Sequence, residues 1–334
     1  MNFKTFCKST FQAAPIMGIG PAAIVAFCSI HAIAQQTVYT DFPQTRGKIE
    51  PLQWDDLPSS MTLDFELRGR TEGQNSLNYT GNGDRIYELT GDCAAIEIRP
   101  TSLPTAYLQS IDTHALGLPT HLIQSNMRDL FDLRQGYLDF HTRPSAIPID
   151  IFASRQGLRF GNNRIIGTSE WTSNWTSNGR TLDGLDGGIG DQSRVYLFST
   201  SVVTVHPTSL DRRGAGLTFH GAYGLITRWI PGVPLSPYVL VHGVRGATSN
   251  LGITGNEVET TFCSEVDGSR PARFDLEANL SLERGSYSNN SIHAGDYFDA
   301  LSYTLAKAPW TPGIGGQFDD ATGNNPTNPN WMPT

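Results

Sequence analysis

The chain has 334 residues, of which 17% are charged, and its formal net charge at pH 7 is −8. This acidic balance argues against nucleic acid as a partner, because nucleic-acid-binding surfaces are basic. The length exceeds what one ordinary compact core needs but suits a β-barrel, and no segment beyond the N-terminus is apolar for long enough to span a membrane as a helix.

The N-terminus has the layout of a secretory signal peptide. Two lysines precede an apolar run over residues 16–30, and AIA at 32–34 offers a small-residue cleavage site. A membrane-spanning helix is the alternative, but glycines and a proline interrupt the run, which falls short of the about 20 apolar residues that a span needs. We therefore predict a signal peptide over 1–34, an extended segment over 35–58 and one β-barrel domain over 59–334.

The cysteines and histidines predict little metal chemistry. Cys7 and Cys28 belong to the signal segment, so only Cys93 and Cys263 remain in the predicted mature chain. One disulfide is possible outside the cytosol, and the sequence does not show whether the two thiols meet. Because there is no C-x-x-C and no histidine pair at metal-ligand spacing, we predict no structural metal and no cofactor.

From residue 62 the chain shows the period-two alternation of strands with two different faces. In TLDFELRGR, residues 62–70, Leu63, Phe65 and Leu67 alternate with Asp64, Glu66, Arg68 and Arg70. The same pattern recurs at 217–225 and at 274–284. Further strands are predicted at 102–112, 131–141, 147–160, 193–205, 236–246 and 258–266, separated by turn-forming residues.

This alternation fits two architectures. In a secreted β-sandwich the apolar face packs against a second sheet, whereas in an outer-membrane barrel it faces lipid and the polar face lines a lumen. The number of strands, their length near ten residues and the charges at mid-strand favour an antiparallel transmembrane β-barrel. The predicted lipid-facing belt includes Leu63, Phe65, Leu67, Leu276, Leu280 and Leu282, with Tyr107, Tyr137, Tyr223 and Tyr238 nearer its margins.

The stretch SRQGLRFGNNRIIG, residues 154–167, contains three of the twenty arginines, which outnumber the four lysines. Parity puts Arg155 on the same face as Ile151, yet an arginine at the bilayer midplane costs about 2–4 kcal/mol. Either a bulge near Ala153–Ser154 resets the face or the arginine lies at the rim of the barrel, and we favour the bulge.

Three neighbouring motifs carry a family resemblance. LRQGYLDF at 133–140, IDIFASRQGLRFGNNRIIGTSEW at 149–171 and WTSNGRTLDGL at 175–185 together resemble the alginate-export family of outer-membrane porins, and the similarity resumes at 259–287 and 316–329. The chain departs from the family at Ser154, Leu182, Asn178 and Asn324. The resemblance implies a monomeric barrel of about 18 strands in outer-membrane lipid, which exports the acidic polysaccharide alginate.

The resemblance also implies a lumen that contains arginine. A ring of fixed cations selects anions, and bidentate arginine–carboxylate bonds suit uronate groups, with acidic residues competing for the same arginines. The predicted pore-lining residues are Arg68, Arg70, Arg155, Arg164, Glu170, Arg180 and Asp183. For each arginine the alternative is an ion pair that stabilises the wall, because the polar faces hold at least as many carboxylates as arginines.

Two other functions remain open. The first is a general porin for small anionic solutes. The second is a secreted β-sandwich that binds or hydrolyses carbohydrate, and hydrolysis requires two carboxylates flanking a sugar bond. Nothing in the sequence pairs such carboxylates, so we predict a transport protein and not an enzyme.

The C-terminus does not finish as outer-membrane barrels usually do. FDDATGNNPTNPNWMPT is a loop rich in Pro and Asn, and the family resemblance breaks off within it. From Met61 onward we place at most about fourteen strands, fewer than the resemblance implies. The sequence therefore predicts a C-terminally truncated barrel, with a curled and incompletely closed sheet.

Overall fold

A computed structural model gives the structure of the chain. It describes residues 51–52, 57–74, 85–101, 104–124, 127–161, 181–230, 232–248, 252–269, 273–305 and 312–322. The chain divides into two compact units, Met1–Thr40 and Asp41–Thr334, and every described residue belongs to the second. The predicted signal peptide and most of the predicted segment 35–58 lie outside the described residues. Among the helices that are described, none has the length and apolar character to cross a membrane.

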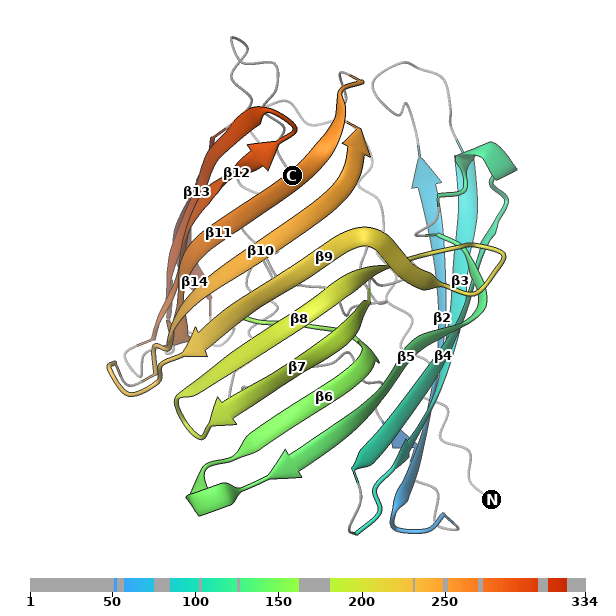
Figure 1. The fold of residues 1–334 in the computed structure, drawn as a ribbon, viewed down its shortest axis with the longest axis horizontal. Helices are drawn as coiled ribbons and strands as arrows, with labels where there is room; N and C mark the ends of the chain where they lie inside the picture. The colour runs from blue at the N-terminus through green and yellow to red at the C-terminus, as the bar shows by residue number, and fades with distance from the viewer. Residues whose placement is uncertain are drawn as a thin grey trace. The chain divides into compact units, whose positions relative to one another are not determined.

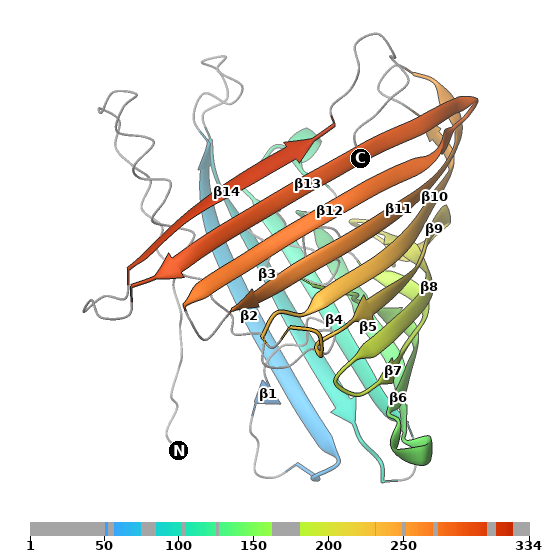
Figure 2. The same ribbon diagram turned by 90° about the vertical axis from the view of Figure 1, so that its left-hand side faces the viewer.

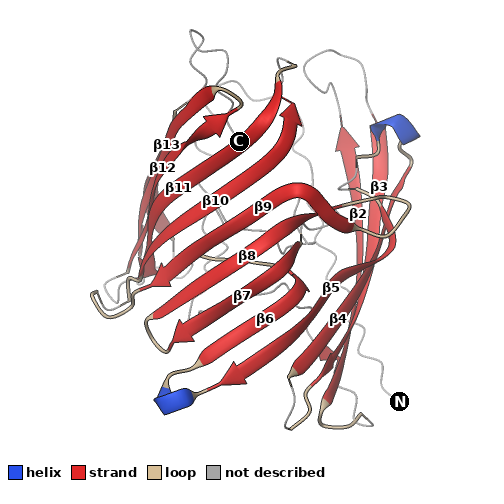
Figure 3. Cartoon of the chain, viewed as in Figure 1, coloured by secondary structure: helices blue, strands red, loops and turns tan. Residues whose placement is uncertain are grey.

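The described residues form one antiparallel sheet of fourteen strands, in which each strand pairs with its neighbours in sequence (Figure 1). The strands are β1 (Pro51–Leu52), β2 (Met61–Gln74), β3 (Arg85–Ile98), β4 (Thr105–Leu116), β5 (Asp129–Thr142), β6 (Ile149–Gln156), β7 (Leu182–Gly190), β8 (Arg194–Thr204), β9 (Arg212–Leu225), β10 (Leu235–Thr248), β11 (Thr254–Ser269), β12 (Phe274–Tyr287), β13 (Asn290–Thr304) and β14 (Gly313–Ala321). Two short 3-10 helices, Thr120–Leu122 and Pro144–Ala146, lie in connections (Figure 3).

The sheet curls and stays open. Figure 2 shows it bending from β2 round to β14. The order of pairing runs from β1 to β14, and within the described residues β14 does not hydrogen-bond to β1 or β2. A closed barrel requires its first and last strands to pair. The prediction of an all-β, incompletely closed antiparallel barrel is therefore confirmed.

The convex face of the sheet is apolar, as the alternation in β2 and β12 predicts. Phe65 and Leu67 are 48% and 72% exposed, whereas Asp64 beside them is 6% exposed. Other exposed apolar residues include Leu108, Leu138, Phe140, Ile151, Leu185, Ile189, Leu197, Phe262, Leu276, Leu280, Leu282 and Leu301. A β-sandwich would bury this face against a second sheet. The described residues form a single sheet, so the β-sandwich alternative is wrong.

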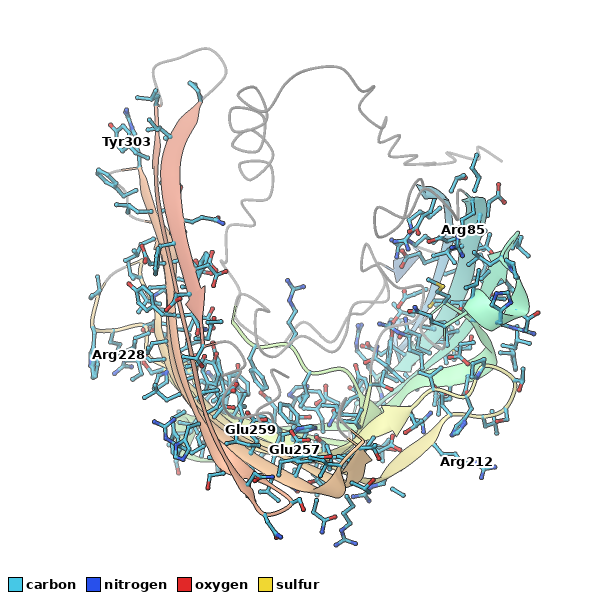
Figure 4. All side chains as sticks on the ribbon, turned by 90° about the horizontal axis from the view of Figure 1, so that it is seen from above. Arg85, Arg212, Arg228, Glu257, Glu259 and Tyr303 are labelled. Atoms are coloured by element: carbon cyan, nitrogen blue, oxygen red, sulfur yellow. The ribbon has the colours of Figure 1, made fainter. Side chains whose placement is uncertain are left out.

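The concave face carries the tyrosines, which corrects one prediction. Tyr107, Tyr137, Tyr223 and Tyr238 were expected near the margins of the exposed belt, yet each is at most 7% exposed. Their register puts them on the opposite face from the belt, and β9 turns its apolar side inward. The physical reason is that these rings stack on one another on the concave side, Tyr107 on Tyr137 and Tyr223 on Tyr238. Figure 4 shows the two faces, with Glu257 and Glu259 on the concave side and Tyr303 on the convex side.

The two cysteines of the described residues do not form a disulfide. Cys93 on β3 and Cys263 on β11 are both free and both buried on the concave side. The open question of their pairing is thus answered, and the sheet is held by its hydrogen-bond ladder and side-chain packing.

Candidate functional site

The candidate site is built where the chain leaves β6. From Ile149 to Gln156, β6 keeps a continuous register with both β5 and β7. The bulge expected near Ala153–Ser154 therefore does not reset the face, although Ser154 has a positive φ of 99°. Arg155 lies one residue before the end of β6 and pairs with Gly136 in the middle of β5, so the structure does not place it at the rim of the sheet either. The described residues that follow β6, Gly157–Gly161, are called the inner segment below.

Buried glutamines anchor the start of the inner segment. The Gly157 backbone N–H donates to Gln135 Oε1 at 3.0 Å, and Gln135 Nε2 donates to Gln109 Oε1 at 2.8 Å. Gln109 Oε1 also accepts from Arg134 Nη1 at 3.1 Å. Because an amide side chain both donates and accepts, Gln135 relays between the backbone and its neighbour. These bonds fix the inner segment to the concave face of β4 and β5.

Aromatic stacking holds the middle of the inner segment. The Phe160 ring centroid lies 4.8 Å from that of Tyr223, 5.3 Å from Tyr196 and 5.7 Å from Phe198. Leu158 is fully buried in the same cluster. Aromatic pairs at such separations add about 0.5–1.5 kcal/mol each to what burial contributes. The inner segment therefore lies across the concave face of β8 and β9.

The end of the inner segment reaches β11. Gly161 has a φ of 57°, in the left-handed region that glycine adopts without steric cost. A Cβ atom at this position would lie 2.0 Å from Oε2 of Glu265, a buried residue of β11. A side chain here would require the Glu265 carboxylate to shift, because the backbone passes directly over that carboxylate.

Arg155 braces the wall beside this departure. Its Nε donates to Asp183 Oδ1 at 2.9 Å and its Nη2 to Asp183 Oδ2 at 3.3 Å. Nη1 donates to the Leu133 carbonyl at 3.0 Å, and Nη2 also donates to the Asp211 carbonyl at 3.1 Å. One guanidinium group thus joins β5, β7 and the connection 205–211 at the point where β6 ends.

The phase of this pair differs from that of the concave residues. Arg155 is four positions from the exposed Ile151, and Asp183 is two positions from the exposed Leu185. The side chains of Arg155 and Asp183 are nevertheless only 11% and 24% exposed. Arg155 and Asp183 bond to each other, and Arg155 also contacts Asp211. These contacts are those of an ion pair that stabilises the wall, which is the alternative to a pore-lining role that the sequence leaves open for each arginine.

The connection 205–211 is fastened by Asp211. Its backbone N–H donates to the carboxylate of Asp132, and its own Oδ1 accepts from the His206 backbone N–H at 2.7 Å. Burial raises the pKa of the Asp211 carboxyl above its ordinary value, and the Asp132 carboxylate acts in the same direction. The His206 N–H and the Arg155 guanidinium oppose this shift.

The concave face carries both signs of charge on β2 but only carboxylates on β11 and β12. Arg68 and Arg70 share the concave phase of β2 with Asp64, Glu66 and Glu72, and Arg70 Nη2 lies 2.6 Å from Glu72 Oε1. The concave positions of β11 and β12 carry the carboxylates of Glu257, Glu259, Glu265, Asp267, Asp275, Glu277 and Glu283. Among the described residues of those two strands, no arginine or lysine occupies a concave position.

The seven predicted pore-lining residues thus have different outcomes. The structure places Arg68 and Arg70 on the concave face and joins Arg155 to Asp183 in the wall. Arg164, Glu170 and Arg180 lie outside the described residues. The glutamine relay and the aromatic cluster were not predicted, because they join the inner segment to separate strands and no local pattern in the sequence marks them.

The sequence matches a known protein family. The sequence model of the family described as alginate export matches residues 60–333, which is most of the chain. No curated protein matches the chain. The matched region contains the whole of β2 to β14, and therefore the inner segment and both charged regions of the concave face.

Proposed function

We propose that this chain, which belongs to the alginate-export family of outer-membrane porins, conducts an acidic polysaccharide of the polyuronate type along its concave face. At the level of the family, the protein is an outer-membrane β-barrel that exports polysaccharide, and its all-β sheet with an apolar convex face agrees with this. What we propose beyond the family-level function is that the solute is a polyuronate and that arginine side chains guide it.

The inner segment is the observation that carries the proposal. It leaves the wall at Gln156 and passes over the concave face as far as Glu265. A segment lying in the lumen narrows the passage and brings the solute close to side chains, where electrostatic selection is strongest. Arg159 lies half-buried between the fully buried Leu158 and the buried Phe160, so this segment also contributes a cation.

The arginines of β2 and the carboxylates of β11 and β12 together favour transport of the polymer over tight binding of it. Arg68 and Arg70 attract carboxylate groups, to which guanidinium forks bind well. The acidic positions of β11 and β12 repel the same groups and limit how tightly the polymer is held. Conduction requires such a balance between entry and release.

Polyuronate binding by the folded 334-residue chain in detergent micelles tests the proposal, because the described sheet does not close into a channel. Polyuronate oligomers should bind reversibly, and uncharged oligosaccharides of the same length should bind less. Arg68→Gln with Arg70→Gln should weaken polyuronate binding. The matched control is Arg245→Gln with Arg284→Gln, because both of these arginines are exposed, Arg284 on the convex face of β12 and Arg245 in the bulge between Val244 and Ala247. Equal binding of both oligomers, or equal effects of the two double variants, would refute the proposal.

A general porin for small solutes is the second candidate function, and the acidic positions on β11 and β12 favour it. A pore dominated by these carboxylates would pass small cations readily. A folded chain that binds polyuronate no more tightly than an uncharged oligosaccharide would support this function over the first.

A further inference from the structure

A separate polar cluster lies on the concave face of β10 and β11. Antiparallel register places His242 directly opposite Glu259, and Glu257 follows at the next concave position of β11. One ligand atom from each of these three side chains lies within 4.8 Å of the other two. Glu257 and Glu259 occupy neighbouring places on the concave side of the sheet (Figure 4).

The chemistry of this cluster suits a borderline divalent cation. An imidazole nitrogen with two carboxylate oxygens is a common ligand set for Zn²⁺ and similar ions. Metal–ligand bonds of about 2.0–2.2 Å put tetrahedral ligand atoms about 3.4 Å apart. The observed separations therefore require side-chain movements of at most about 1 Å, which rotation about χ angles supplies without moving either strand.

Carboxylates surround the cluster on β11 and β12. Glu283, on the concave side of β12, lies one concave position away from the residue opposite Glu259. The described concave positions of these two strands hold no arginine or lysine. A divalent cation bound by His242, Glu257 and Glu259 would offset the charges of two carboxylates. Glu259 is buried, whereas His242 and Glu257 are half-buried, so an ion has access from the concave side.

We propose that His242, Glu257 and Glu259 form a binding site for a divalent transition-metal cation of the zinc type. Glu283 lies beside the site on the concave side of β12, and the remaining coordination position faces the concave side. Glu257 lies fifteen positions after His242, which is why spacing in the sequence predicts no metal site. Metal binding by these three residues is independent of which solute the barrel carries.

Zinc titration of the folded 334-residue chain in detergent micelles, after removal of metals by a chelator, tests the site. Isothermal titration should show saturable binding of one Zn²⁺ per chain, with much weaker binding of Ca²⁺ and Mg²⁺, which prefer oxygen ligands. With Cu²⁺ as a spectroscopic probe, electron paramagnetic resonance should show coupling to one imidazole nitrogen. His242→Gln should abolish that coupling, and Glu257→Gln should weaken Zn²⁺ binding at least about 10-fold, since even loss of an outer-shell partner costs that much.

Two matched variants act as controls. His114→Gln removes a partly exposed histidine that pairs with Asp112 at 3.2 Å on the convex face. Glu277→Gln removes a concave carboxylate that faces Asp267 with no histidine nearby in register. Both should leave Zn²⁺ affinity unchanged. Heat-modifiable gel mobility identifies folded chains, and if His242→Gln does not fold, the Cu²⁺ spectrum of the unmodified chain decides. No saturable Zn²⁺ binding, no nitrogen coupling, or an equal loss in either control would overturn the proposal.

Discussion

Arg155 and Asp183 face each other in register across β6 and β7, and two guanidinium nitrogens donate to the two carboxylate oxygens. The pair lies where β6 ends and the chain turns onto the concave side. At this point the wall loses a strand, and the same guanidinium group binds two backbone carbonyls from other elements. The wall is therefore held by a side chain where its backbone ladder stops.

Replacing Arg155 by alanine should lower the free energy of unfolding by about 2–4 kcal/mol, because it leaves a largely buried carboxylate and two carbonyls without their donor. Urea unfolding in lipid vesicles measures this loss. Arg143→Ala is the control, since Arg143 Nη2 lies 4.0 Å from Asp191 and both side chains are largely exposed. That variant should lose at most about 1 kcal/mol. Equal losses of unfolding free energy in the two variants would show that Arg155 does not stabilise the wall.

Gly161→Ala should destabilise the chain more than Gly246→Ala. Both glycines have positive φ, 57° and 65°, so an added Cβ costs about 1–2 kcal/mol at either position. Nothing lies within 4 Å of a Cβ at Gly246, whereas a Cβ at Gly161 meets the buried Glu265 carboxylate. The difference between the unfolding free energies of the two variants measures the effect of the contact with the Glu265 carboxylate. A difference near zero would show that the inner segment does not press on β11.

Leu67→Arg should cost about 2–4 kcal/mol in a bilayer, because Leu67 lies at mid-strand on the apolar convex face. Leu210→Arg makes the same change in the exposed connection before β9, where the cost should be near zero. The measurement is equilibrium unfolding from vesicles. A small cost for Leu67→Arg would mean that lipid does not cover this face.

Acidification should stabilise the connection 205–211. The raised pKa of Asp211 means that the folded chain takes up a proton at a higher pH than the unfolded chain does. Stability therefore increases as the pH falls from the raised value toward the ordinary value of about 3.9. Asp211→Asn should remove this increase. Hydrogen exchange of the connection at several pH values, compared between the two chains, would refute the expectation if their difference stayed constant.

The sequence predicts those strands whose two faces differ in polarity. β2 and β12 alternate without a break, and both have the predicted orientation. β3, β7, β13 and β14 were missed, and in β7 and β14, LDGLDGGIG and GIGGQFDDA, glycines remove the periodic signal. The predicted strand 147–160 was too long, because the chain leaves the sheet after Gln156 to form contacts with distant strands.

The site was less predictable than the fold, for a related reason. An alternation of period two shows that a strand has two different faces. It does not show whether the apolar face lies on the concave or the convex side of the sheet. Tyr223 is buried because Phe160 packs on it, and these two residues are far apart in sequence. The His242–Glu259 pair likewise depends on the register of β10 and β11. Contacts of this kind follow from topology, which local patterns do not specify.

The two free thiols allow the unfolding of the sheet to be followed by chemical modification of the natural chain. Cys93 lies on β3 and Cys263 on β11, at well-separated positions in the pairing order, and both are shielded on the concave side. A maleimide reagent alkylates a thiol only after the surrounding strands separate. Mass spectrometry of the two cysteine-containing peptides therefore reports, without any engineered label, which part of the sheet comes apart first.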